Sequence, residues 1–345
     1  MYPVPYSLIL LQAEAYIRPG HFYAAVVLFS GLILVLIAGM GFILIRKNRR
    51  ALREKQLQGL FQDWLVGIIL EETDAQHPGF AVPEGIRRVL LQGFARQELL
   101  QELQRLKKSL SGQPAENLEK LYRQLDLAGL SARSLRSRRW HRKARGIQEL
   151  AAMNQAGFVA EIYPLTNHRH PVVRMEAQIA LVSLQQYQGL GFFEDLVHPL
   201  TQWHQMKLLQ LLASQPIPSA ADITRWLQSP NVSVVQFTLR LIGEQHAGNF
   251  QQEVIACLCH PDETIRRQAI ACLGEIPSAP AAKALRDLFR REPDKSLQIA
   301  ILAELIKTGT AGDRPFLQEL RQAPDAEIRL AADKALLQLQ SQVAA

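Results

Sequence analysis

Residues 261–274 read PDETIRRQAIACLG, and this stretch shows the repeating unit from which the larger part of the chain is built. One apolar position within it recurs along the chain at intervals of 30 to 32 residues. This first register consists of Val173, Trp203, Val234, Ile265, Leu297 and Ile328. A second apolar register follows eight residues later in each unit, at Leu181, Leu211, Ile242, Leu273, Leu305 and Leu336. A repeat of this period predicts a solenoid of stacked helical units, none of which can bury its apolar face alone.

Prolines mark the same point in each unit. Pro199, Pro230, Pro261, Pro293 and Pro324 precede the first register by four residues, and Pro171 precedes it by two. Because proline is tolerated in the first turn of a helix, each unit is predicted to be a helix, a proline-marked turn and a second helix. The second helix would carry both registers on its inner face. Small residues at equivalent positions predict close helix packing, and they are Ala177, Ala269, Ala332, Ala180, Cys272 and Ala335.

Three units resemble the HEAT repeat family, in its short version of about thirty residues found in phycobilisome-lyase-like repeats. The resemblance is carried by PDETIRRQAIACLG (261–274), PDAEIRLAADKAL (324–336) and PVVRMEAQIAL (171–181). It covers residues 155–340, with a degenerate unit beginning near Trp140, while the units at 203, 234 and 297 keep the period without the consensus. The resemblance implies a concave surface lined by the second helices, and Asp/Arg pairs such as Asp262 with Arg266 that tie one repeat to the next.

Residues 22–45, FYAAVVLFSGLILVLIAGMGFILI, contain no charged residue. At 1.5 Å per residue this run would form a helix of roughly 36 Å, enough to cross a hydrocarbon core of ~30 Å with some tilt. A signal peptide would need its positive charges before the run and a shorter apolar core, and a globular core helix of this length would show a polar face. We therefore predict a single transmembrane helix that anchors the chain.

The orientation of the span follows from the charges that flank it. Residues 46–55, RKNRRALREK, hold six Lys/Arg and one acid, whereas Arg18 is the one Lys or Arg before the span. Because positive charge is retained on the cytoplasmic side, the chain is predicted to be single-pass in a bacterial plasma (inner) membrane with a cytoplasmic C-terminal part. The basic segment is also expected to contact anionic lipid.

The fold class is predicted to be all-α, because no strand-like alternation follows the span. Helices are expected over residues 51–72, about 86–108 and 116–127, with a loop over 73–85 and a break at 109–114. The expected domains are a short extracytoplasmic N-terminus (1–21), the transmembrane helix (22–45), a basic juxtamembrane and helical linker region (46–135) and a HEAT-like α-solenoid (136–345).

A second basic run, RSLRSRRWHRKAR over residues 133–145, contains seven Lys/Arg and no acid. The chain has a formal net charge of +7. The two basic stretches together sum to +12, so the remainder sums to −5. The run could contact phosphates, acidic lipid or an acidic protein, or it could be a solvated helix face. The candidate interaction surface consists of Arg133, Arg136, Arg138, Arg139, Trp140, Arg142, Lys143 and Arg145.

The sequence shows no recognisable catalytic or metal-binding motif. Cys257, Cys259 and His260 lack the second ligand pair of a zinc site, and side chains two residues apart on a helix point in different directions. The histidines of Asn167–Pro171 are expected in a solvated turn. Three cysteines without framework spacing fit a reducing compartment. We expect no cofactor, no bound metal and no enzymatic activity.

The function predicted from these features is a membrane-anchored cytoplasmic scaffold that binds another protein through its solenoid. The chain resembles bacterial membrane-anchored HEAT-repeat proteins, and this resemblance implies a partner in a membrane glycosyltransferase system of envelope polysaccharide synthesis. One alternative is a lyase-like HEAT enzyme that acts on a small ligand. A nucleic-acid-binding HEAT protein is a weaker alternative, because residues 155–345 hold 17 Lys/Arg against 19 Asp/Glu.

Overall fold

The computed structural model describes residues 19–72, 79–308 and 311–344, and every regular element within them is a helix. The all-α prediction is confirmed for this part of the chain. The chain divides into two compact units, Met1–Leu125 and Asp126–Ala345. Residues 1–18 of the predicted extracytoplasmic segment (1–21) and residues 73–78 of the predicted loop (73–85) lie outside the described residues. Residues 79–83 of that loop are irregular, as predicted, and a helix begins at Glu84.

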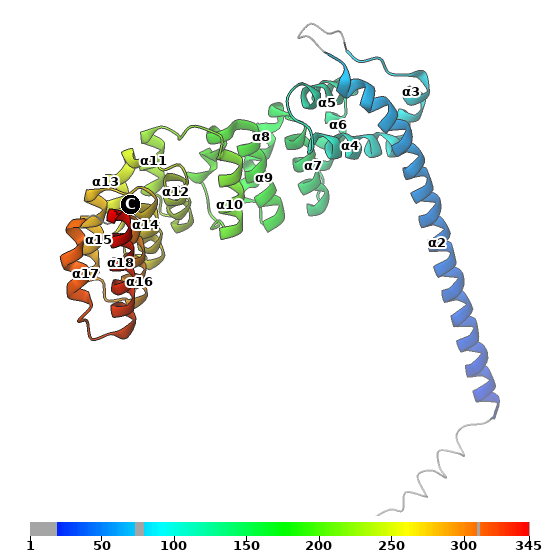
Figure 1. Ribbon diagram of the computed structural model, residues 1–345. Helices are drawn as coiled ribbons and strands as arrows, with labels where there is room; N and C mark the ends of the chain where they lie inside the picture. The colour runs from blue at the N-terminus through cyan, green and yellow to red at the C-terminus, as the bar shows by residue number, and fades with distance from the viewer. Residues whose placement is uncertain (1–18, 73–78, 309–310, 345) are drawn as a thin grey trace, which may run out of the picture. The chain divides into compact units, whose positions relative to one another are not determined.

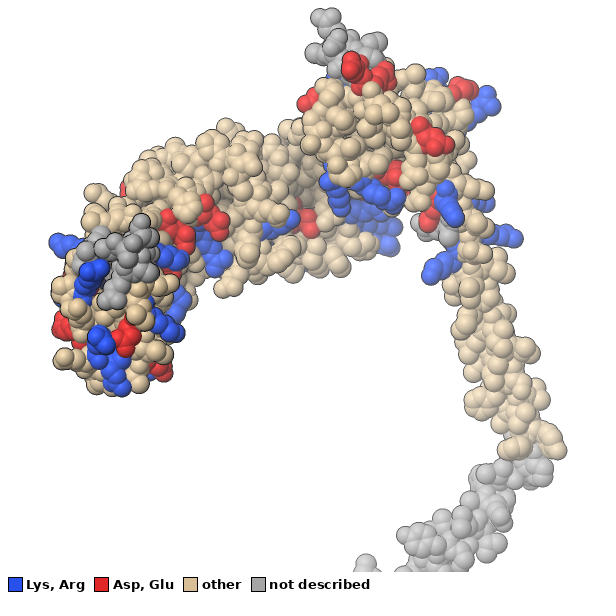
Figure 2. Space-filling view, in the orientation of Figure 1, with Lys and Arg blue, Asp and Glu red and all other residues tan. Residues whose placement is uncertain are grey.

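The first unit is built on one long helix, α2 (Pro19–Leu70), which contains both the apolar run and the predicted amphipathic helix. The described side chains of residues 22–45 are almost all exposed, whereas Phe61, Leu65 and Ile68 near the C-terminal end are buried. Figure 2 shows the same change: one length of this helix carries no charged side chain, and Lys and Arg surround it further along. The two parts of α2 therefore have different environments within a single helix.

Three further helices complete the first unit: α4 (Gly93–Lys107) and α5 (Gln113–Gln124) pack on α2, and α3 (Glu84–Leu90) packs on α4. The single helix expected over 86–108 is interrupted at residues 91–92. Asn117 is fully buried, and its side-chain amide donates hydrogen bonds to the carbonyl oxygens of Ile68 (3.0 Å) and Glu71 (2.9 Å). These bonds occupy carbonyl groups that the end of α2 leaves without intrahelical partners.

The second unit is a row of helical pairs, in which we call the first helix A and the second helix B (Figure 1). The A elements are α6 (Ala128–Leu135), α8 (Val159–Ile162) with its flanking 3-10 turns, the 3-10 helix η3 (Gln186–Phe193), α11 (Ala220–Leu227), α13 (Gln251–Cys257), α15 (Ala279–Arg291) and α17 (Arg314–Leu320). The B helices are α7 (Trp140–Ala152), α9 (Pro171–Gln185), α10 (Gln202–Leu212), α12 (Val232–Glu244), α14 (Glu263–Glu275), α16 (Lys295–Thr308) and α18 (Ala326–Ala344). Helix α6 packs against α7, so the degenerate unit expected near Trp140 begins with an A helix at Ala128.

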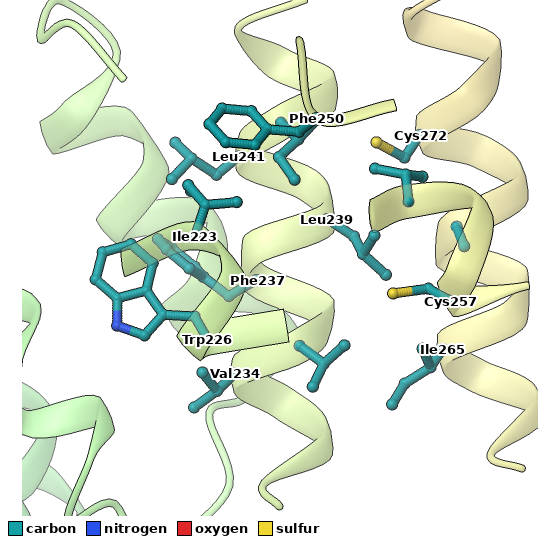
Figure 3. Packing of buried hydrophobic residues seen from close by; sticks show 14 of the residues in the cluster. Ile223, Trp226, Val234, Phe237, Leu239, Leu241, Phe250, Cys257, Ile265 and Cys272 are labelled. Atoms are coloured by element: carbon teal, nitrogen blue, oxygen red, sulfur yellow. The ribbon is translucent and has the colours of Figure 1, made fainter. Parts of the chain in front are cut away.

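Most of the two apolar registers form the continuous core between the pairs. Ile265 and Leu273 are fully buried, and Figure 3 shows Val234 and Ile265 among the packed side chains of the hydrophobic cluster. All six small residues predicted at close contacts are buried. Helix α7 has Gly146 at the position of Ala177. A Cβ atom added to this glycine would lie 2.3 Å from the backbone nitrogen of Leu135, so α6 and α7 meet at backbone distance.

The prediction for α10 is wrong, because Trp203 and Leu211 are exposed, at 60% and 37%. His204 and Leu212 occupy the buried positions instead. The N-cap residue is responsible for the shift. Five B helices other than α10 have their first register residue three positions after the N-cap, as Ile265 follows Asp262. In α10 the N-cap is Thr201, and the residue three positions after it is His204. The helix is therefore rotated by one residue relative to the predicted register.

The prolines also differ from their predicted place. Pro171 lies in the first turn of α9, as expected. Pro230, Pro261 and Pro324 instead stand immediately before the capping residues Asn231, Asp262 and Asp325, outside the helix. The carboxylate of Asp262 accepts from the backbone N–H groups of Thr264 (2.8 Å) and Ile265 (3.4 Å), which an uncapped helix would leave without partners.

Candidate interaction surfaces

Three cations of the basic run form contacts within the second unit. The guanidinium of Arg136 donates two hydrogen bonds to the carboxylate of Glu161, at 2.8 and 3.0 Å. These bonds hold the pKa of Glu161 below its ordinary value. Lys143 donates to the carbonyl of Leu135 (2.9 Å), and Arg145 donates to the buried carboxylate of Glu149 (2.7 Å).

The remaining cations of the run stay at the surface. The side chain of Arg133 donates to the carbonyl of Gly129 at 3.2 Å. Arg138, Arg139 and Arg142 are exposed, and no ion pair of theirs is found within the described residues. The structure therefore divides the predicted surface into cations that stabilise the fold and cations that face solvent.

Trp140 connects the run to the turn of the next repeat. Its ring lies flat against that of His170, with centroids 4.1 Å apart and planes at 12°, and 46% of Trp140 is exposed. The stacking brings the exposed Arg169 beside the run. Sequence reasoning missed this neighbour, although Pro171 stands 31 residues after Trp140, one repeat period further along the chain. We call the solvent-facing set Arg138, Arg139, Arg142 and Arg169 the basic edge.

The Asp/Arg pairs expected between repeats are not formed as predicted. Asp262 and Asp325 cap their own helices, while Arg266 donates to the carbonyl oxygens of His260 (3.1 Å) and Pro261 (3.0 Å) in the turn of its own repeat. Arg266 also reaches the next repeat, where Glu292 accepts at 3.1 Å. The arginine does link two repeats, but its acidic partner is a buried glutamate that the pattern did not identify.

Polar side chains join successive B helices over the C-terminal half of the solenoid. Gln236 donates to Thr264 (2.7 Å), and Arg240 donates to Gln268 (3.0 Å). Arg267 bonds Ser296 at 2.6 Å. Within the described residues, no side-chain hydrogen bond joins α10 to α9 or to α12. The outer face of α10 carries Trp203 and Met206 instead, which are 60% and 64% exposed, and we call these two residues the α10 apolar patch.

The cysteine and histidine residues form no metal centre in the described part of the chain. No group of three or more His, Cys, Asp or Glu could hold an ion there. Burial raises the pKa of the Cys257 thiol to about 11 and that of Cys272 to about 12, while Cys259 is exposed. Two of the three thiols are therefore protonated core residues.

The fold and the repeated caps define an α-solenoid of helical pairs. Residues 220–306 match the family model for HEAT repeats. The match assigns this segment to the HEAT repeats, and similar helical pairs continue on both sides of it.

Solved structures with similar chains include human deoxyhypusine hydroxylase and the complex of CpcE and CpcF, a phycocyanin lyase from Nostoc sp. PCC7120. The hydroxylase is 13% identical with a TM-score of 0.33, over 75% of this chain and 96% of that chain. The lyase is 14% identical with a TM-score of 0.24, over 78% and 99%. No curated protein matches the sequence. Similarity at these levels carries no information on activity.

Proposed function

We propose that the chain is a single-pass membrane protein whose cytoplasmic HEAT solenoid binds another protein and has no enzymatic activity of its own. The observation that carries the proposal is the division of α2. Residues 22–45 form an exposed, charge-free helix, and the same helix supplies Phe61 and Leu65 to the core of the first unit.

The exposed apolar part of α2 is stable only where something shields it from water. Its most apolar 18-residue window has a mean hydropathy of 2.7 and no buried residue, and by length and composition this helix could cross a membrane. Apolar surface in water costs about 25 cal/mol per Å², so such a helix is stable when lipid surrounds it. The six Lys/Arg of residues 46–55 favour retention of that end in the cytoplasm.

Protein binding is supported by the α10 apolar patch. Trp203 and Met206 are one turn apart on one B helix, and large exposed side chains of this kind are over-represented at protein interfaces. A membrane-associated partner agrees with the proposed anchor. A glycosyltransferase of envelope polysaccharide synthesis is the candidate that the resemblance to membrane-anchored HEAT-repeat proteins suggests.

Site-specific photo-crosslinking in intact membranes tests the proposal. A photoreactive residue replaces Trp203 or Met206, and the controls carry it at Lys283 or Asp287, which are exposed on the A helix α15. We expect one membrane protein to be captured at both patch positions and at neither control position, with the chain itself in the membrane fraction. Equal capture at all four positions, or a chain that fractionates with soluble proteins, would contradict the proposal.

A further inference from the structure

A groove lies within the first unit, beside the point where the apolar run of α2 ends. Its volume is about 670 Å³, and α2 forms one wall while the other is formed by residues of α3, α4 and the bend between them. Arg46, Arg49 and Arg53 line the α2 side. Their spacing of three and four residues places all three on one face of the helix. The groove is therefore a concave surface with a row of cations along one side.

The cations in the groove are not neutralised by the protein. Arg46, Arg49 and Arg53 are exposed, and no ion pair of theirs is found within the described residues. The described residues that line the groove include no Asp or Glu. Three guanidinium groups without carboxylates favour an anion, and a phosphate suits their planar donor geometry.

Apart from Gln56 and Gln92, the rest of the lining is apolar. Phe42 extends the α2 wall toward the apolar run, and Val89 and Phe94 face it from the second wall. An inorganic anion would use the arginines alone, whereas an amphiphile with a phosphate and a hydrocarbon part would use both kinds of lining. The combination therefore favours a phosphate-bearing lipid.

The position of the groove relative to the membrane also fits a phospholipid. This step rests on the proposed transmembrane span. Arg46 directly follows the apolar run, so Arg46 and Arg49 lie within about 6 Å of its end along the helix axis. The polar head-group layer is roughly 5–7 Å thick on each side of the hydrocarbon core. We propose that the groove binds one anionic phospholipid, with its phosphate on Arg46, Arg49 and Arg53 and its hydrocarbon part against Phe42, Val89 and Phe94.

Lipid binding in a groove depends on the shape of the groove as well as on its charge, whereas lipid binding to a basic helix depends on charge alone. The test uses the full chain purified in detergent, titrated with dioleoyl phosphatidylglycerol and followed by native mass spectrometry. Arg49→Gln with Arg53→Gln removes two lining cations, and the matched control Lys47→Gln with Lys55→Gln removes two exposed cations that do not line the groove. Val89→Trp fills the groove without changing the charge.

We expect the lining double variant and Val89→Trp to reduce phosphatidylglycerol binding roughly tenfold or more, and the control to reduce it less than about twofold. Equal loss in the two double variants would show that charge density alone attracts lipid, and unchanged binding in Val89→Trp would overturn the groove. Competition by free glycerol phosphate would indicate a soluble phosphate ligand and contradict the lipid assignment. Because the titration is done in detergent, its failure is separable from failure of membrane anchoring, which fractionation measures.

Discussion

The hydroxyl of Thr201 accepts a hydrogen bond from the backbone N–H of His204, at 3.3 Å. This cap fixes where α10 begins and therefore which of its side chains enter the core. His204 is 4% exposed, and its Nε2 atom has no hydrogen-bond partner in the described structure. The neighbouring Trp203, which is the better hydrophobe, is left in solvent. One cap thus accounts for both the buried histidine and the α10 apolar patch.

The buried histidine predicts a pH dependence of stability. Burial, with a smaller contribution from Arg174, lowers the pKa of His204 to about 4. The unfolded chain, with a pKa near 6.5, binds the proton more readily, so folding stability should fall as pH drops from about 6.5 to about 4. The loss should be on the order of 2–3 kcal/mol in the second unit.

His204→Leu should remove this dependence and raise stability at neutral pH, because leucine is apolar and leaves no orphaned nitrogen. Urea unfolding of both variants at pH 7.5 and pH 5 measures the effect. A His204→Leu variant that loses as much stability on acidification as the parent would show that another group is responsible.

Truncation of register residues should destabilise the solenoid. Ile265→Ala and Leu273→Ala each remove a fully buried side chain, at an expected cost of ~2–5 kcal/mol. Leu337→Ala is a matched control, because Leu337 is 67% exposed and should change stability by less than ~0.5 kcal/mol. Hydrogen exchange should locate the damage in neighbouring repeats. A change below about 1 kcal/mol at both buried sites would contradict the register.

Gly146→Ala should disrupt the first pair of the solenoid. The added methyl group would meet the backbone of α6 at 2.3 Å, and backbone cannot move aside as a side chain can. We expect a loss of ~1–3 kcal/mol, as for overpacking in general. The control is Gly248→Ala, where nothing lies within 4 Å of the added atom. Thermal unfolding of both variants makes the comparison, and equal melting temperatures would count against the close approach.

The basic edge should contribute to binding without contributing to folding. Changing Arg138, Arg139 and Arg142 to Gln should weaken association of the chain with anionic liposomes or its partner, and increasingly so at low salt. Arg136 is left unchanged, since it is bonded to Glu161. The control changes the exposed Lys283, Arg291 and Lys334 to Gln. If both triple variants bind like the parent at low salt, the basic edge is a solvated face.

The predicted topology can be checked by proteolysis. Protease added to the cytoplasmic side of membrane vesicles should digest the chain beyond about residue 46, where the six Lys/Arg begin to follow the span. Immunoblotting of the products against a C-terminal tag provides the measurement. Protection of the C-terminal part from that side, with digestion from the other, would reverse the proposed orientation.

Local patterns were sufficient to predict the helical repeat. The period, the small residues and the apolar registers depend on spacing along one helix, so Ile265 and Ala269 could be placed in the core from the sequence alone. The charge-free run before Arg46 depends on composition and length in the same way. It predicts a membrane span before any fold is known.

Helix caps and side-chain partners were decided by the three-dimensional structure, whether the partner is four residues away, as Glu149 is from Arg145, or 25 residues away, as Glu161 is from Arg136. The rotation of α10 depends on Thr201 as its cap. The repeat period fits Trp203 and His204 equally, and the apolar side chain favoured Trp203. The basic run was split because Glu161 and Glu149 lie within reach of Arg136 and Arg145, and Arg169 joined it through the stacking of Trp140 on His170. The physical reason is that periodicity fixes which face of a helix is apolar, whereas caps and neighbouring side chains fix how that helix is turned and which charges remain free for a partner.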